Sequence, residues 1–230
     1  MNMKMKTLAG ILAVGALVAS GSASALPWSA SGTIGLWKAW GGAVLDGGAC
    51  PTGFTCNGIG DSDTTFTWVG GAQPPGVALL HDDTKVFFSE REVGGVDFYN
   101  VDFSKGDTQQ VIVGNRAEYR IVTTDPEGLN GAALGSQRSG PEFSFVEKIV
   151  RDETGAVTLL ALGSTNGARE PAIGYAGFAP TLSILVQDNL GTTNFESLTN
   201  EYRMGELPEP ATLALFGIGL LGLLGRRRAA

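Results

Sequence analysis

The sequence predicts an all-β protein whose body folds as an antiparallel β-sandwich, with a jelly-roll-like or Greek-key order of strands. Glycine is abundant, at 34 of 230 residues, which is about twice the usual share of ~7%. Short apolar or alternating segments recur at roughly 10-residue spacing between Gly, Asp, Asn and Pro, a pattern typical of strands joined by tight turns. A chain with many short strands has to close or stack its sheets to protect their edges. We therefore expect two packed sheets.

The first 25 residues have the three parts of a secretory signal peptide: a basic start, an apolar run and small side chains at the −3 and −1 positions of a cut. A retained membrane helix is the alternative, but 13 apolar residues reach only about 20 Å of a ~30 Å hydrocarbon core. Signal peptidase is therefore an expected partner, and export places the mature chain in an oxidising compartment. The parts are Lys4 with Lys6, residues 7–19, and Ala23 with Ala25 before the new N-terminus at Leu26.

The last 23 residues combine a short motif, an apolar segment and a basic end. Proline can begin a helix because its missing N–H costs nothing there, and the 15 residues after Pro210 carry no charge. Such a helix reaches about 22 Å and contains four glycines, so we expect a single membrane helix that serves as a temporary anchor in the inner membrane. Arginines stop transfer and stay on the cytoplasmic side. The parts are Pro208, Glu209 and Pro210, then residues 211–225, then Arg226, Arg227 and Arg228.

This arrangement resembles the PEP-CTERM sorting signal of exported bacterial proteins, in which a Pro-Glu-Pro motif, a membrane helix and a basic cluster end the chain. The resemblance implies recognition by an exosortase, a membrane-embedded enzyme similar to a cysteine transpeptidase. It also implies removal of the tail and delivery of the body to the cell surface or the exopolysaccharide matrix. A simple tail anchor is the alternative. The resemblance covers residues 208–230, so it indicates the route and leaves the activity of residues 26–207 open.

Residues 26–207 form the secreted domain, and period-two alternation dominates their sequence. The clearest hairpin joins residues 143–150 to residues 157–162, with Gly155 free to take the left-handed conformation in the turn between them. The other expected strands are residues 33–37, 64–69, 85–90, 96–103, 110–113, 117–123 and 181–186.

Residues 193–204 fit two structures. Thr193 and Glu196 have capping-box spacing, and Phe195, Leu198 and Tyr202 follow at helical intervals. A last strand that leads into the sorting signal is the alternative.

The charge of the secreted domain argues against nucleic acid as a partner. The chain ends contain two lysines, three arginines and Glu209. Without these residues, the secreted domain holds 11 basic and 22 acidic residues, a net charge of −11. Phosphate binding needs a basic stripe, and the basic residues here are isolated. We expect a surface or matrix protein with no catalytic activity and no cofactor. A secreted carbohydrate-binding module and a secreted hydrolase are the alternatives.

Cys50 and Cys56 are the two cysteines of the sequence, and their short spacing and the oxidising compartment predict a disulfide between them. So small a ring contributes about 2 kcal/mol in the chain-entropy model, which would fix a local loop. A catalytic thiol is the alternative, and it would need His81, the one histidine of the chain, as its base.

The acidic motifs predict little chemistry. His81-Asp82-Asp83 is expected to be a solvated turn, because adjacent residues of an extended segment point apart. Asp61 and Asp63 form a weak calcium candidate that lacks the glycine and glutamate of an EF-hand loop. Asp97 and Asp102 are five residues apart and face opposite sides if one strand runs through both. They form the carboxylate pair of a glycosidase only if Tyr99-Asn100 makes a turn or bulge.

All four tryptophans fall in the first 43 residues of the mature chain. Apolar ring faces suit sugars, whereas core packing is the simpler explanation. Trp68 alternates with Phe66 and is expected to be buried. Trp37 and Trp40 are the better candidates for an exposed exopolysaccharide-binding surface. A binding module would expose tryptophan on a sheet face, and a hydrolase would show a cleft with converging carboxylates.

Overall fold

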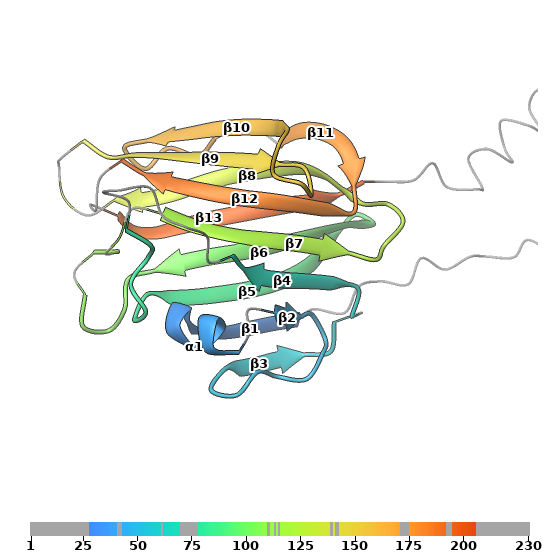
Figure 1. The fold of residues 1–230 in the computed structure, drawn as a ribbon, viewed down its shortest axis with the longest axis horizontal. Helices are drawn as coiled ribbons and strands as arrows, with labels where there is room; N and C mark the ends of the chain where they lie inside the picture. The colour runs from blue at the N-terminus through green and yellow to red at the C-terminus, as the bar shows by residue number, and fades with distance from the viewer. Residues whose placement is uncertain are drawn as a thin grey trace, which may run out of the picture.

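The computed structural model describes residues 28–40, 43–60, 62–69, 78–109, 111–112, 114, 116–138, 140, 143–170, 175–191 and 195–205. Two sheets of antiparallel strands pack face to face in this part of the chain (Figure 1). The predicted β-sandwich is therefore confirmed. The predicted signal peptide with its cut at Leu26, and the sorting signal of residues 208–230, lie outside the described residues. No helix in the described ranges is long and apolar enough to cross a membrane.

One sheet has seven described strands, and its centre pairs strands from distant parts of the sequence. Next to β13 lie β8 on one side and β6 on the other. From one edge to the other the order is β11 (Ala176–Thr181), β8 (Leu129–Arg138), β13 (Phe195–Met204), β6 (Val96–Ser104), β5 (Lys85–Val93), β1 (Trp28–Thr33) and β3 (Thr55–Gly58).

The second sheet has six described strands, and it supplies the other half of the core. Alternation is clear in β7, where Ala117, Tyr119 and Ile121 are buried between half-buried neighbours. The order is β10 (Thr158–Thr165), β9 (Phe145–Arg151), β12 (Ser183–Leu190), β7 (Arg116–Thr123), β4 (Thr64–Trp68) and β2 (Ala43–Leu45).

The expected strand at residues 33–37 is wrong, because β1 ends at Thr33 and helix α1 (Ile34–Ala39) follows. Thr33 has the extended backbone of an N-cap, and its hydroxyl accepts a hydrogen bond from the Leu36 N–H at 3.3 Å. Ile34 and Trp37 lie three residues apart and are both buried, which is helical spacing. The cap and the spacing outweigh the β-propensity of the segment.

Residues 111 and 112 are not in a strand either, against the prediction for residues 110–113. Ile112 is fully buried in a connection, where its N–H donates to the Phe195 carbonyl at 2.7 Å. A Cβ at position 114 would clash with the Leu79 carbonyl oxygen. Gly114 also has a φ of 105°, a conformation that favours glycine. Ile112 therefore anchors a loop.

The segment that fitted both a helix and a strand forms strand β13 from Phe195. It pairs with β6 on one side and with β8 on the other. Tertiary pairing on both edges outweighs the capping-box spacing, whose Thr193 lies outside the described residues.

The predicted β9–β10 hairpin is confirmed. Asp152 accepts hydrogen bonds from the backbone N–H groups of Ala156 (3.0 Å) and Val157 (3.1 Å). These donors hold the pKa of the Asp152 carboxyl below its usual value. Gly155 has a φ of 75°, as the turn requires.

Candidate functional site

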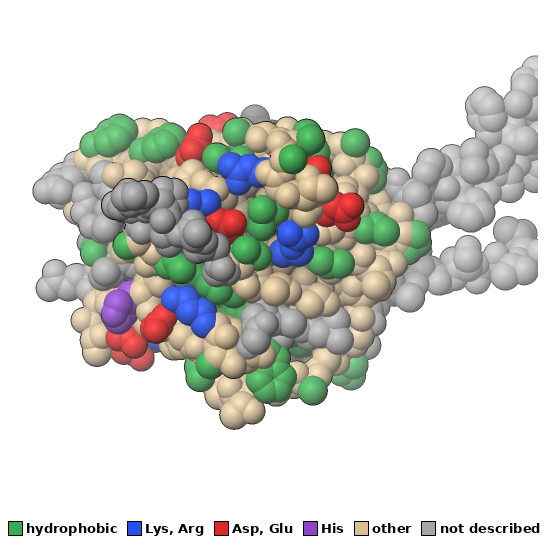
Figure 2. Space-filling view, in the orientation of Figure 1, with side chains coloured by type: hydrophobic (Ala, Val, Ile, Leu, Met, Phe, Trp, Pro, Cys, Tyr) green, Lys and Arg blue, Asp and Glu red, His purple; other side chains and the backbone are tan. Residues whose placement is uncertain are grey.

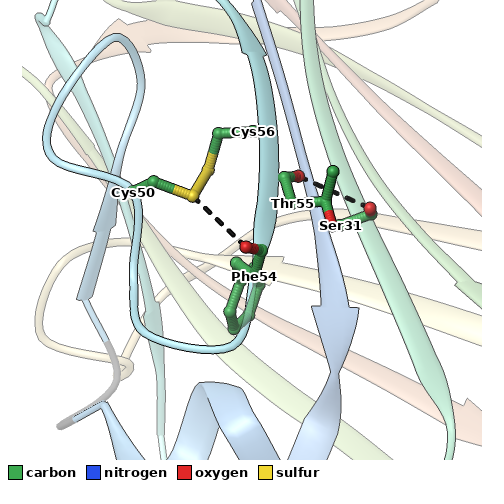
Figure 3. Close-up of a disulfide and its surroundings, with 5 residues drawn as sticks. All are labelled: Ser31, Cys50, Phe54, Thr55 and Cys56. Carbon is green, nitrogen blue, oxygen red and sulfur yellow. Dashed lines mark hydrogen bonds between the residues drawn. A yellow bond between two sulfur atoms is a disulfide. The ribbon is translucent and has the colours of Figure 1, made fainter.

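The Cys50–Cys56 disulfide is confirmed, and it closes a loop that enters β3 (Figure 3). The disulfide-closed loop places Phe54 in the core, where this residue is 9% exposed. Its phenyl ring centroid lies 6.3 Å from that of Phe88. Gly32 leaves the space that Phe54 fills, since a Cβ there would lie 2.9 Å from the phenyl ring. Both cysteines are bonded, so the catalytic-thiol alternative is wrong.

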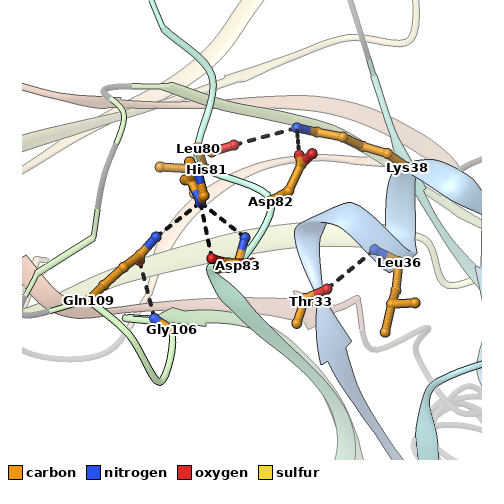
Figure 4. Close-up of polar contacts among 9 residues, drawn as sticks. All are labelled: Thr33, Leu36, Lys38, Leu80, His81, Asp82, Asp83, Gly106 and Gln109. Carbon is orange, nitrogen blue, oxygen red and sulfur yellow. Dashed lines mark hydrogen bonds and ion pairs between the residues drawn. The ribbon is translucent and has the colours of Figure 1, made fainter.

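His81, Asp82 and Asp83 form an exposed turn, as predicted (Figure 4). The His81 ring accepts a hydrogen bond from the Asp83 N–H at 3.3 Å. Asp82 turns away from the ring and binds Lys38 of α1 at 2.6 Å. Because this hydrogen bond favours the carboxylate, it lowers the pKa of Asp82. The ion pair between Asp82 of this turn and Lys38 therefore connects α1 to the sandwich.

Three of the four tryptophans are buried, so they do not share one exposed surface. The predicted exposure of Trp37 is wrong: its side chain is 0% exposed and lies 4.8 Å from Phe88 and 5.3 Å from Trp68, between ring centroids. The helical turn of α1 points Trp37 into the core and leaves Trp40, at the C-cap, 43% exposed. Trp28 and Trp68 are buried, as core packing predicts.

The predicted acidic candidates stay apart. Asp61 lies outside the described residues, so the calcium site remains a prediction. Asp63 accepts hydrogen bonds from the Tyr99 hydroxyl (2.9 Å) and the Thr64 hydroxyl (2.8 Å). Strand β6 carries Asp97 and Asp102 without a register shift against β5, so they face opposite sides. No group of three His, Cys, Asp or Glu suited to a metal occurs in the part of the chain that the structure describes.

Sequence reasoning missed a groove on the outer face of the seven-stranded sheet, with a volume of about 330 Å³. We call it the Glu201 groove. Leu198, Asn200 and Tyr202 of β13 point into the core, so the residues between them point out. The lining residues are Ala133, Gly135, Ser136 and Gln137 of β8, Gly167 and Arg169 after β10, and Ser197, Thr199 and Glu201 of β13.

The floor and one wall of the groove have separate origins. On the floor, Gly135 is the register partner of Thr199, and the missing side chain leaves the depression. The wall comes from the connection between β10 and β11, which crosses from one sheet to the other. There the backbone of Glu170 exchanges two hydrogen bonds with Leu134, at 2.6 and 2.7 Å. This short pairing sets Arg169 beside the sheet face.

Glu201 is held at the groove by three donors from separate parts of the chain. Arg169 contacts Oε2 at 2.5 Å, Arg91 contacts Oε1 at 3.5 Å, and the Tyr175 hydroxyl donates to Oε2 at 2.8 Å. The Glu201 side chain is only 14% exposed. Burial and the nearby carboxylate raise the pKa of Tyr175, so its hydroxyl keeps its proton. Glu201 is therefore fixed by these contacts, and the two arginines more than compensate its charge.

The outer face of the six-stranded sheet carries a polar network of its own. Its polar side chains bind each other: Gln187 accepts from Arg116 (2.6 Å) and Arg151 (2.9 Å) and donates to Asn189 (2.6 Å). Lys and Arg are interspersed with Asp and Glu on the face in Figure 2. Polar side chains restrain one another on both outer faces, since in the groove Ser197 donates to Gln137 at 3.4 Å.

A second feature that sequence reasoning missed is a polar chain inside the sandwich. Lys148 Nζ donates to the Tyr202 hydroxyl (3.0 Å), which lies 2.6 Å from the Tyr119 hydroxyl, and Tyr119 donates to Asp188 (3.2 Å). All four side chains are fully buried. Burial lowers the pKa of Lys148 to about 8 and raises that of Asp188. Their sequence signal was a charge at an inward position of an alternating strand, as at Lys148 between Val146 and Val150.

Asp102 of β6 interacts electrostatically with Glu201 at the groove and with Lys148 of the interior chain. Its Oδ1 accepts from the Asn200 N–H at 3.2 Å, while Asn200 Nδ2 donates to the Val101 carbonyl at 2.9 Å. These side chains complete the β6–β13 ladder locally. Burial raises the pKa of Asp102 to about 6, with a further increase from the charge of Glu201 and an opposing effect from Lys148.

The comparisons with known proteins bear on the end of the chain. Residues 206–228 match the family model of the PEP-CTERM protein-sorting motif. This motif implies an exported protein that an exosortase processes. No curated protein matches the sequence. The match thus agrees with the motif, apolar segment and arginines found in the sequence. It does not cover the β-sandwich, so the role of the sandwich has to be inferred from its structure.

Proposed function

We propose that this protein is a non-catalytic component of the bacterial cell surface or exopolysaccharide matrix, sorted by an exosortase. The match of residues 206–228 to the PEP-CTERM protein-sorting motif carries the proposal. Signal peptidase cuts before Leu26, residues 211–225 hold the precursor in the inner membrane, and the exosortase cuts near Pro208. The body is then released to the outside.

The sorting step follows from the physics of the tail. Fifteen uncharged residues insert in the bilayer and place the Pro-Glu-Pro motif at its outer surface. Three terminal arginines hold the helix there, because each costs several kcal/mol to move through the bilayer centre. The Cys50–Cys56 disulfide suits the oxidising compartment that export reaches.

The groove supports a binding role over a hydrolytic one. Glu201 is the one carboxylate among the described residues that line it, and Arg169 and Tyr175 both contact it. Glycoside hydrolysis uses a pair of carboxylates across the scissile bond. A fixed carboxylate whose charge is compensated by arginines suits recognition of a ligand.

The test is intact-mass measurement of the protein from membrane, cell surface and medium in cells that contain an exosortase. Wild-type protein should lack the arginines of the tail, and replacement of Pro208-Glu209-Pro210 by alanines should leave uncut precursor in the inner membrane. The matched control replaces Pro126 and Glu127 by alanine, a Pro-Glu pair in the turn between β7 and β8. If the motif variant is cut and released as the wild type is, the sorting-signal proposal is wrong, and the tail is an ordinary membrane anchor or a substrate of another protease.

A further inference from the structure

We propose that the Glu201 groove binds an uncharged polysaccharide chain through the hydroxyl groups of its sugars. This inference rests on the proposed function, since export is what brings the β-sandwich to polysaccharide outside the cell. The site is distinct from the tryptophans that the sequence suggested.

The shape of the groove fits an extended polar ligand. Its volume of about 330 Å³ lies at the low end of ligand sites, roughly 300–1,000 Å³. Gly135 and Ala133 give the floor little side-chain bulk, and the groove is open to solvent. A short stretch of a longer chain can lie on such a surface and continue past it.

The lining offers the groups that sugar hydroxyls need. A hydroxyl both donates and accepts a hydrogen bond. Ser197 and Thr199 present hydroxyls and Gln137 presents an amide. Glu201 adds acceptors and Arg169 adds donors, held in place by their ion pair. Restrained polar side chains of both kinds bind a polyol with little loss of conformational entropy on the protein side.

The charges disfavour other ligand classes. Arg169 is the one basic residue among the described lining residues and it is already paired with Glu201, so phosphate or a uronic acid finds no unpaired cation in that lining, and the acidic secreted domain repels it. Arg91 and Arg169 already neutralise Glu201, which removes the attraction for a cation. An added peptide strand needs free backbone groups, whereas β13 is paired on both edges. An uncharged polyhydroxylated chain remains.

The experiment is affinity electrophoresis of exported protein, collected from cells that process it, in gels containing soluble glucan, mannan, galactan or xylan. Alginate and polygalacturonate serve as acidic probes. Thr199→Phe places a ring over Gly135 and fills the groove from an exposed position. Gln137→Ala removes an exposed amide without adding bulk. The matched control is Thr158→Phe, the same exchange at an exposed end of β10.

We expect wild-type and Thr158→Phe protein to be retarded by at least one neutral polymer. Thr199→Phe should abolish the retardation, and Gln137→Ala should weaken binding by about tenfold, the effect of losing one well-placed polar contact. Glu201→Gln leaves Arg91 and Arg169 without their counter-charge, so it should shift binding toward alginate.

Three outcomes would overturn the proposal. They are retardation by acidic polymers alone, equal retardation of Thr199→Phe and wild type, and no retardation by any of the four neutral polymers. Each leaves the exosortase proposal standing, because the protein tested has already been exported and its mass records the processing. Failure of processing would instead appear as uncut precursor before any polysaccharide is added.

Discussion

The interior of the sandwich differs between the end built from β1, β4 and β5 and the end built from β9, β12 and β13. The first end is aromatic: Trp37 packs against Phe88 and Trp68, and Phe66 lies 5.2 Å from Phe88. The second holds the chain from Lys148 to Asp188. Tyr119 joins the two, because its ring lies 5.9 Å from Trp37 and its hydroxyl belongs to the polar chain.

The two ends stabilise the fold in different ways. Burial of an apolar side chain contributes about 1.5–3 kcal/mol with little dependence on direction. Buried charges gain little net free energy, because desolvation offsets their attraction. They are satisfied in one strand register, since a slip of one residue would turn Lys148 to the opposite face. We infer that the aromatic end supplies stability and the polar end fixes the pairing of β9, β12 and β13.

The largest effect should come from the aromatic end. Trp37→Ala removes a fully buried indole and leaves a cavity, so the free energy of unfolding should fall by about 4 kcal/mol. Chemical denaturation measures this change. Trp40→Ala is the matched control, because Trp40 is 43% exposed. Equal losses in the two variants would contradict the burial of Trp37.

At the polar end, one substitution should lower the free energy of unfolding and a second substitution should restore it. Lys148→Met leaves the buried charge of Asp188 without its cation, at a cost of about 3 kcal/mol. Adding Asp188→Leu removes that charge and should restore most of the lost stability. A double variant that is as unstable as the single one would show that the polar chain stabilises the sandwich outright.

The pH dependence of stability should separate Asp102 from Lys148. The folded pKa of Asp102 is raised to about 6, so its contribution is fully present below its unfolded value and is lost as pH rises through 6. Lys148 has its folded pKa lowered to about 8, so stability should rise between about pH 8 and 10.5 as the unfolded state gives up its extra proton.

These slopes are measured as the difference between wild type and a variant that cannot titrate. Against Asp102→Asn, wild type should lose on the order of 3 kcal/mol between pH 4 and pH 6. Against Lys148→Met it should gain above pH 8. Parallel curves for wild type and both variants would contradict the burial of these charges.

The smallest effect should come from the disulfide loop, at the edge of the aromatic end. Reduction of Cys50–Cys56 should lower stability by about 2 kcal/mol and the melting temperature by about 4 to 8 °C. Thermal melts with and without reductant measure it. Free thiols in unreduced exported protein, or global unfolding on reduction, would each contradict a local role.

The sequence predicted features that depend on neighbouring residues. Alternation located β4 and β7, and Gly155 marked the β9–β10 turn. It failed where distant residues decide the structure. Trp37 is buried because α1 turns it inward, and β13 is a strand because two strands hold it. The Glu201 groove joins β8, β13 and the β10–β11 connection, a juxtaposition that no spacing in the sequence reports.

Along the strand direction the sandwich has two further ends, distinct from the aromatic and polar ends. The first and last described residues determine which of these two a tether would hold. Strand β1 begins and β13 ends at the same end of the sandwich, since each step from β1 through β5 and β6 to β13 is antiparallel (Figure 1). The membrane attachment that we propose beyond Gly205 would therefore hold that end. It leaves the opposite end, with α1, the Lys38–Asp82 ion pair and the exposed ring of Trp40, as the part that meets the surroundings first.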